Sequence, residues 1–188
     1  YFAAGGSLKV IGTAIGFGLA GLSVAIQSFQ KQRIMTWLNP EADPYGAGYN
    51  IIQSMMAFVA GGFFGEGYGN SRQKLGWLPE GHTDFIFAII GEELGFVGCC
   101  IVVFLLLLII IQCIIIGIRS QNLAGQIICG GMAALIGFQS FINMGVATGI
   151  LPNTGLSLPF VSSGLTSIVC FYMGIGFVLN VSLQPKKY

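Results

Sequence analysis

Charged residues are scarce in this chain: only 8% of its 188 residues are Asp, Glu, Lys or Arg, against about 25% in soluble proteins. None lies between Ser120 and Pro185, and hydrophobic residues reach 54% of the total. A chain with so little charge cannot cover a water-facing surface. The composition therefore excludes a soluble domain and indicates an integral membrane protein.

Other features that the sequence lacks exclude further functions. There is no basic patch and no RNA-binding motif, and the net charge is only +1, so we expect no nucleic-acid partner. The five cysteines lie in apolar runs, without the paired spacing of a zinc site or the loop positions of a disulfide framework. We interpret them as small hydrophobic residues that face lipid or other helices.

Long apolar runs are what the chain does have. About 20 apolar residues, at 1.5 Å per residue, cross a hydrocarbon core of about 30 Å. We therefore expect an all-α fold, a polytopic transmembrane helix bundle in which residues 1–188 form a single membrane domain. The expected spans, about five in all, lie at 10–30, 50–66, 94–118, 124–149 and 164–183.

The orientation of such a bundle follows from the Lys and Arg residues near the ends of its spans. With five spans, one side carries Lys31, Arg33, Arg119, Lys186 and Lys187, and the other carries Lys9, Arg72 and Lys74. The side with more positive charge is expected to be cytoplasmic. The acidic loop within 67–93 and the loop at 150–163 then both face outward.

The 150–163 loop is unusual because it contains Pro152 and Pro159 but no charge. Non-helical backbone at membrane depth is tolerated only where protein or a watery cavity covers it. We interpret this Pro/Gly loop as a re-entrant segment that lines a cavity. The alternative is a short connector that lies on the membrane interface.

The stretch "PEGHTDFIFAIIGEELGF", residues 79–96, places carboxylates in apolar sequence. Asp84 either caps a helix that begins at Phe85 or is a functional carboxylate. Glu92 and Glu93 either begin the following span, where acids favour the helix dipole, or face the cavity. In a continuous helix, Asp84 and Glu92 lie about 80° apart around the axis and about 12 Å apart along it, so both reach one cavity.

Three polar residues near this stretch have two interpretations each. His82 contributes with Asp84 to a metal site, or it is an exposed loop histidine. Arg72 and Lys74, in "GNSRQKLGW", bind an anionic headgroup such as a pyrophosphate, or they belong to a solvated interfacial loop. The residues alone indicate a polytopic protein with an outward acidic cavity.

Two long motifs resemble the SEDS family of bacterial membrane proteins, which includes FtsW, RodA and SpoVE. They are "YGAGYNIIQSMMAFVAGGFFGEGYGNSRQKLGWLPEGHTDFIFAIIGEELGFVG" and "NMGVATGILPNTGLSLPFVSSG". The order "GNSRQK" before "LPEGHTDFIF" is more similar to the FtsW and SpoVE branch than to RodA. Because family members have roughly ten spans, five spans indicate a C-terminal fragment.

The resemblance implies a peptidoglycan glycosyltransferase in the bacterial cytoplasmic (inner) membrane, active in cell division or cell-shape control. Such an enzyme polymerises lipid II into glycan strands on the outer side and works with a class B penicillin-binding protein, a transpeptidase. Its α-linked donors give β-linked glycan, so we expect inversion by a single displacement without a covalent intermediate.

The resemblance also implies roles for individual residues. The essential cavity aspartate of the family falls on Asp84, either as the base for the attacking sugar hydroxyl or as the ligand of a divalent cation, Mg or Mn, at the pyrophosphate. The residues expected to contact the substrate are Lys74, Glu80, His82, Thr83, Glu92, Glu93, Pro152, Ser162 and Ser163. The last motif departs from the family, because Ser163 and Leu165 stand where Tyr and Gly are usual.

Two other functions fit the same residues. The first is a flippase for a lipid-linked precursor, since an acidic cavity and a re-entrant loop also suit headgroup translocation. The second is a scaffold that recruits a transpeptidase and tolerates Ala at Asp84, Glu92 and Glu93. Asp84 separates them, because polymerisation needs a base and transport does not.

Overall fold

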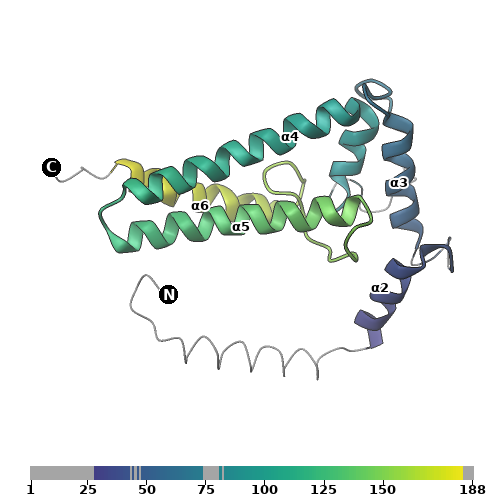
Figure 1. The fold of residues 1–188 in the computed structure, drawn as a ribbon, viewed down its shortest axis with the longest axis horizontal. Helices are drawn as coiled ribbons and strands as arrows, with labels where there is room; N and C mark the ends of the chain where they lie inside the picture. The colour runs from purple at the N-terminus through teal and green to yellow at the C-terminus, as the bar shows by residue number, and fades with distance from the viewer. Residues whose placement is uncertain are drawn as a thin grey trace.

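The structure is a computed structural model that describes residues 28–183, apart from positions 43, 45, 47, 74–80 and 82. Over this part of the chain the regular elements are all helical, which confirms the all-α class (Figure 1). In chain order they are α2 (Ser28–Leu38), the short 3-10 helix η2 (Pro40–Ala42), α3 (Tyr49–Gly61), α4 (Ile86–Arg119), α5 (Leu123–Ala147) and α6 (Leu165–Leu183).

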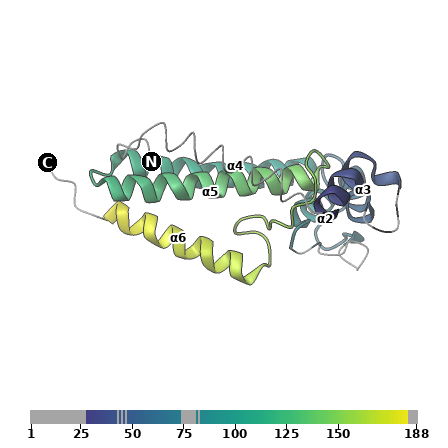
Figure 2. The same ribbon diagram turned by 90° about the horizontal axis from the view of Figure 1, so that it is seen from below.

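The helices α4, α5 and α6 are the three of the described residues that are long and apolar enough to cross a membrane. They correspond to the spans expected at 94–118, 124–149 and 164–183. The bounds agree to within two residues, except that α4 begins eight residues earlier than expected. α4 and α5 lie side by side, and α6 packs against them near Arg119 and diverges toward its own N-terminus (Figure 2). The buried residues of this packed end are Cys113, Cys129, Ala133, Val178 and Val181.

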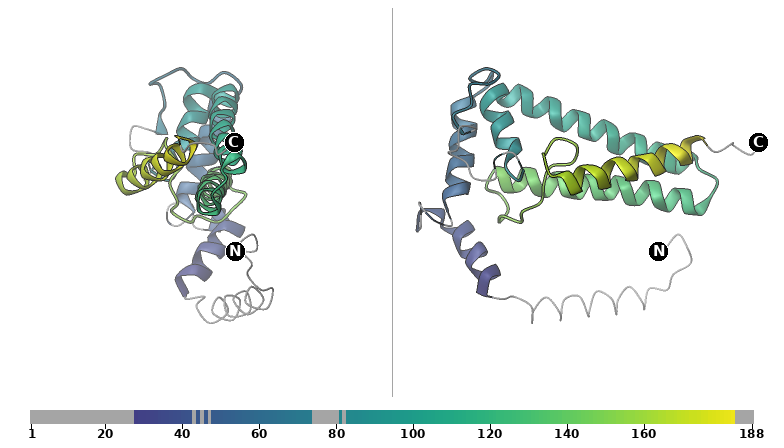
Figure 3. Two further views of the ribbon diagram at one scale, coloured as in Figure 1. Left: turned by 90° about the vertical axis from the view of Figure 1, so that its left-hand side faces the viewer. Right: turned by 180° about the vertical axis from the view of Figure 1, so that it is seen from behind.

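α3 is shorter than the span expected at 50–66, because the helix ends at Gly61. Its 13 residues cover about 20 Å, which is shorter than a hydrocarbon core of about 30 Å. α3 instead crosses the end of the bundle where α5 ends (Figures 1 and 3). There the buried hydroxyl of Ser54 donates a 2.6 Å hydrogen bond to the carbonyl of Ala147. Apolar composition alone predicted a longer helix than the one that the structure contains.

α2 lies at the same end of the molecule. The guanidinium of Arg33 donates to the carbonyl of Asn153 at 3.0 Å, and the indole N–H of Trp37 donates to the carbonyl of Gly149 at 2.8 Å. Arg33 therefore lies beside the Pro/Gly loop. The five-span arrangement had placed it on the opposite side of the membrane from this loop. Except for residues 28–30, the span expected at 10–30 lies outside the described residues.

α4 is broken at Gly95, whose backbone (φ 67°, ψ −164°) is not helical. The break frees backbone groups on both sides of it, and buried backbone groups need partners. The turn after α3 supplies partners for four of them. Glu66 and Gly67 donate to the carbonyls of Glu92 (2.9 Å) and Glu93 (3.1 Å), and the N–H groups of Phe96 and Val97 donate to Gly62 (2.9 Å) and Phe63 (3.3 Å). Residues 86–94 thus lie beside α3, and the membrane-crossing part of α4 begins after Gly95 (Figure 1).

Candidate active site

Asp84 lies in the turn that leads into α4. The N-cap of α4 is Phe85, which is completely buried, so the prediction that Asp84 caps a helix beginning at Phe85 is wrong. The Phe85 side chain packs with Ala57, Ala88 and Val146 and so fixes the turn to α3 and α5. Asp84 itself is half-buried.

The backbone of this turn is held by side chains from two distant segments. The hydroxyl of Ser162 donates to the carbonyl of Thr83. The side-chain amide of Asn143, on α5, donates to the carbonyl of Asp84 at 2.7 Å and to the carbonyl of Leu156, also at 2.7 Å. The structure therefore brings together three of the predicted site residues, Thr83, Asp84 and Ser162.

The Pro/Gly loop folds back along α5 after the helix ends at Ala147. The amide of Gln139 donates to the carbonyl of Ser157 at 3.0 Å. Gln139 lies eight residues before the end of α5, which is about 12 Å along the helix axis. Leu158 and Pro159 are buried and Pro152 is half-buried. The loop therefore folds back along α5 as far as Gln139.

The loop passes directly beside the Asp84 side chain. A Cβ atom added to Gly155 would lie 3.6 Å from Oδ2 of Asp84, and Gly155 has a φ of +72° that favours glycine. Phe160 has a φ of +63°, the one positive φ of a non-glycine residue in the described part of the chain. Its ring packs against Phe171 and Tyr172. Strained backbone of this kind clusters at functional sites, and here it lies two residues before Ser162.

Glu92 anchors a loop. Its carboxylate is 1% exposed and accepts hydrogen bonds from the hydroxyl of Ser71 and from the backbone N–H groups of Arg72 (3.1 Å) and Gln73 (3.3 Å). The carboxylate therefore faces the segment 71–73. The expectation that Asp84 and Glu92 lie on one continuous helix is wrong, because α4 begins only at Ile86.

Glu93 is buried next to Glu92, shortly before the break at Gly95. The two glutamates thus end the first part of α4, and the interpretation that they begin the following span is wrong. Ser163 is exposed beside Ser162. Lys74, Glu80 and His82 lie outside the described residues.

The sequence predictions missed Asn143. It is 1% exposed and is the residue that connects the Asp84 turn to the Pro/Gly loop. A polar signal was present, because Gln139, Ser140 and Asn143 interrupt an otherwise apolar span at helical spacing. A search restricted to ionisable residues does not find Asn143, because its side chain carries no charge.

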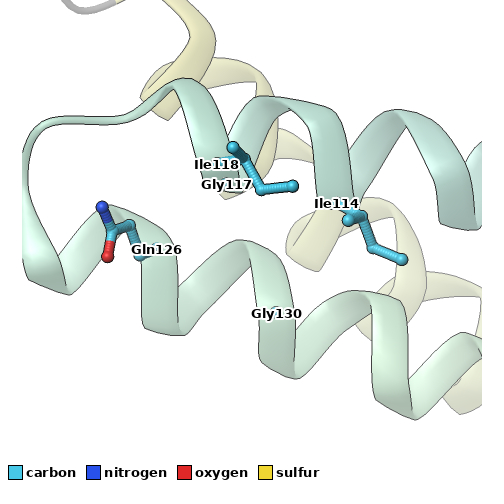
Figure 4. A pocket seen from close by; sticks show the side chains of 5 residues that line it. All are labelled: Ile114, Gly117, Ile118, Gln126 and Gly130. Atoms are coloured by element: carbon cyan, nitrogen blue, oxygen red, sulfur yellow. The ribbon is translucent and has the colours of Figure 1, made fainter. Parts of the chain in front are cut away.

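A cavity of about 400 Å³ lies at the other end of the bundle, between α4 and α5 (Figure 4). Its wall consists of Ile114, Gly117, Ile118, Gln126 and Gly130. Gly130 is 13 residues from Asn143 along α5, about 20 Å, so this cavity is separate from the Asp84 turn.

These features define a class: a multi-pass helical membrane protein in which a carboxylate-bearing turn and a folded-back Pro/Gly loop are held together at one end of the bundle. The chain belongs to the FtsW/RodA/SpoVE family, whose model, described as "Cell cycle protein", matches residues 1–187. The resemblance seen in the sequence is thereby confirmed.

Named relatives agree with the family. The chain is 42% identical over 172 residues to the "Probable peptidoglycan glycosyltransferase FtsW" of Tolumonas auensis, covering 89% of this chain and 44% of the relative. It is 42% identical over 174 residues to the "Stage V sporulation protein E" of Bacillus subtilis, covering 90% of this chain and 48% of the relative. The chain spans about half the length of the curated relatives that it matches.

A solved structure shares the fold. It is described as "Structural coordination of polymerization and crosslinking by a peptidoglycan synthase complex" and superposes with a TM-score of 0.69 at 28% identity. The match covers 94% of this chain and 50% of the solved chain.

Proposed function

We propose that this protein is a peptidoglycan glycosyltransferase that polymerises lipid II, and that Asp84 is its general base. The names of the relatives support the reaction class. The observation that carries the assignment to Asp84 is its placement. It is a half-buried carboxylate beside the Pro/Gly loop, on a turn whose backbone is held from two sides.

In the proposed reaction a hydroxyl oxygen of the acceptor sugar attacks the anomeric carbon of the donor. The new C–O bond forms as the bond between that carbon and the pyrophosphate oxygen breaks, and the pyrophosphate leaves with the electron pair. Asp84 accepts the proton of the hydroxyl, which raises its nucleophilicity in the transition state. One displacement inverts the α-linkage of the donor to a β-linkage in the glycan.

The departing pyrophosphate needs positive charge nearby. Arg72 is exposed, and its backbone N–H is fixed by the buried Glu92. Lys74 follows two residues later in the chain. We assign the pyrophosphate to this basic segment. The contacts to the remaining substrate are assigned to Glu80, His82, Thr83, Glu93, Pro152, Ser162 and Ser163.

A divalent cation, Mg²⁺ or Mn²⁺, would serve the same leaving group. Among the described residues, no three His, Cys, Asp and Glu side chains form a metal site by themselves. Mg²⁺ usually binds through only one or two carboxylates together with substrate phosphates, so Asp84 would be the residue that holds such a cation. The proposed reaction routes no step through it. The effect of Mg²⁺ or Mn²⁺ is measured directly by adding each to the assay.

The Asp84 end of the bundle is proposed to face the outer side of the cytoplasmic membrane, where glycan strands are built. A class B penicillin-binding protein is the proposed partner, which would crosslink the strands that this protein makes. The description of the solved relative, which joins polymerisation with crosslinking, supports this pairing.

The test is polymerisation of lipid II by the protein from the complete reading frame, purified in detergent with and without the transpeptidase. Detergent leaves no membrane to cross, so a flippase makes no polymer under these conditions, and neither does a scaffold. We expect glycan strands on a gel. Their absence with the partner and a divalent cation present would favour transport or scaffolding.

A further inference from the structure

We propose that Asn143 is a positioning residue that sets the Asp84 turn and the Pro/Gly loop at a fixed distance from each other. The proposal rests on the proposed function, since it assigns to Asn143 the geometry that the Asp84 base requires. One nitrogen atom of Asn143 donates to the carbonyls of both Asp84 and Leu156, each at 2.7 Å. Two segments that lie far apart in the sequence are thus joined through a single side-chain atom.

The chemistry of the amide fits this task. Both neighbours of the Asn143 side-chain nitrogen are carbonyl oxygens, which only accept, so the amide must present its two N–H groups to them. Its own oxygen is buried and has no hydrogen-bond partner among the described residues. Both N–H groups of the Asn143 amide therefore form hydrogen bonds, whereas its carbonyl oxygen forms none with the described residues. That pattern favours a link between two carbonyls over a general stabilising contact.

α5 is a suitable frame for the link. The end of α5 is tied to α3 by the Ser54 hydroxyl, which donates to Ala147, and Asn143 lies one turn before this tie. The Leu156 carbonyl follows Gly155 directly, and Gly155 is the residue that approaches the Asp84 carboxylate. Fixing the carbonyls of Asp84 and Leu156 therefore fixes the carboxylate against the loop.

The test replaces Asn143 in the protein from the complete reading frame. Asn143→Leu keeps a similar volume without any donor, and Asn143→Asp keeps the shape without the amide hydrogens. Two matched variants serve as comparisons on the same helix. Gln139→Leu removes a bond to the loop at Ser157 that does not involve Asp84, and Gln126→Leu removes a 2.8 Å bond to the carbonyl of Ser120 at the far end.

The first measurement is the initial rate of polymerisation against lipid II concentration. A misplaced base lowers kcat and leaves substrate binding intact, and a displacement of about 1 Å can cost about 100-fold. We expect Asn143→Leu to lower kcat by about this factor with KM nearly unchanged. Gln126→Leu should behave as the wild type. A wild-type kcat in both Asn143 variants would overturn the proposal.

The second measurement, hydrogen–deuterium exchange, does not depend on activity. Loss of the link should raise exchange in the peptides covering 83–90 and 150–163 in both Asn143 variants, whereas Gln139→Leu should raise it only in 150–163. Exchange that rises only in 150–163 for Asn143→Leu would overturn the proposal, because Asn143 would then anchor the loop alone. If Asn143→Leu fails to fold, Asn143→Asp carries both measurements. A wild type without polymerase activity would refute the proposed function, and the exchange pattern would still decide the role of Asn143.

Discussion

Replacing Gly95 by Ala should be among the most damaging single-methyl changes in this chain. The backbone of Gly95, at φ 67° and ψ −164°, is a conformation that costs other residues about 1–3 kcal/mol. The added Cβ would also lie 2.4 Å from the backbone nitrogen of Gly65 and 2.6 Å from the carbonyl carbon and oxygen of Phe63. These are backbone atoms, so no side-chain rotation relieves the clash.

The turn that follows α3 must therefore move away from α4. That movement stretches four backbone hydrogen bonds across the break, which are the bonds that satisfy the groups freed by it. Each contributes about 0.5–1.5 kcal/mol net. Adding the conformational strain, we expect Gly95→Ala to lower the free energy of unfolding by about 3–9 kcal/mol, the upper limit applying if all four bonds are lost.

Substitutions at two other glycines separate the contribution of backbone strain from that of the steric clash. Gly62 has a φ of +51° but no atom within 4 Å of an added Cβ, so Gly62→Ala pays strain without a clash. Gly130 is helical and equally open, so Gly130→Ala should stabilise the helix by about 0.5–1 kcal/mol. The assay is chemical or thermal unfolding of the purified protein in detergent. The reasoning is refuted if Gly95→Ala unfolds no more easily than Gly62→Ala.

Three further predictions concern buried hydrogen bonds. Glu92→Leu should raise hydrogen exchange in the segment 71–73, because the carboxylate that accepts its N–H groups is gone. Ser162→Ala should lower the polymerisation rate more than it lowers stability, because the turn at Thr83 loses one of its two supports; rate and unfolding are measured on the same preparation. Ser54→Ala should lower the free energy of unfolding by about 1–3 kcal/mol, since a buried carbonyl loses its partner, as unfolding in detergent would show.

Matched variants control these predictions. Glu66→Leu changes an exposed acidic residue of the same region and should leave the exchange of 71–73 unaltered. Ser182→Ala removes a 2.7 Å bond within α6, at the far end from Thr83, and should not affect the rate. Equal effects of Glu66→Leu and Glu92→Leu would show that the Glu92 carboxylate is no anchor.

The spanning helices could be predicted from sequence because length and apolar composition determine them. α4 contains a charge-free run from Leu94 to Ile118, and α5 and α6 carry no charge at all. The same reasoning did not predict the length of α3. Its residues are apolar, but it ends at Gly61, and its partner at the end of α5 is 93 residues away in sequence. Pattern alone could not show that its apolar face packs on protein.

The break at Gly95 could not be predicted from the local sequence either, because it depends on a partner segment elsewhere in the chain. A single glycine in an apolar run is compatible with a continuous helix, and only the turn at 62–67, which pairs with the freed backbone groups, makes the break stable. Glu92 lies before this break, so the break does not separate it from Asp84. The Glu92 carboxylate instead faces the segment 71–73, which Glu92 anchors.

Of the candidate site, the sequence indicated the side chains but not what holds them. Asp84, Thr83 and Ser162 were predicted, and the structure brings them together. Asn143 was not predicted, because it carries no charge and its partners are backbone carbonyls, one of them 59 residues away. Hydrogen bonds from a side chain to backbone carbonyls are hard to predict from a sequence, since any residue can supply a carbonyl.

The most direct test of the central claim is Asp84→Asn, assayed for polymerisation of lipid II and, separately, for binding of lipid II. The substitution keeps the size of the side chain and removes the proton acceptor. We predict that the variant makes no polymer and binds lipid II as the wild type does, while the exposed control Glu66→Gln keeps full activity. Full polymerisation by Asp84→Asn would contradict the assignment of Asp84 as the base.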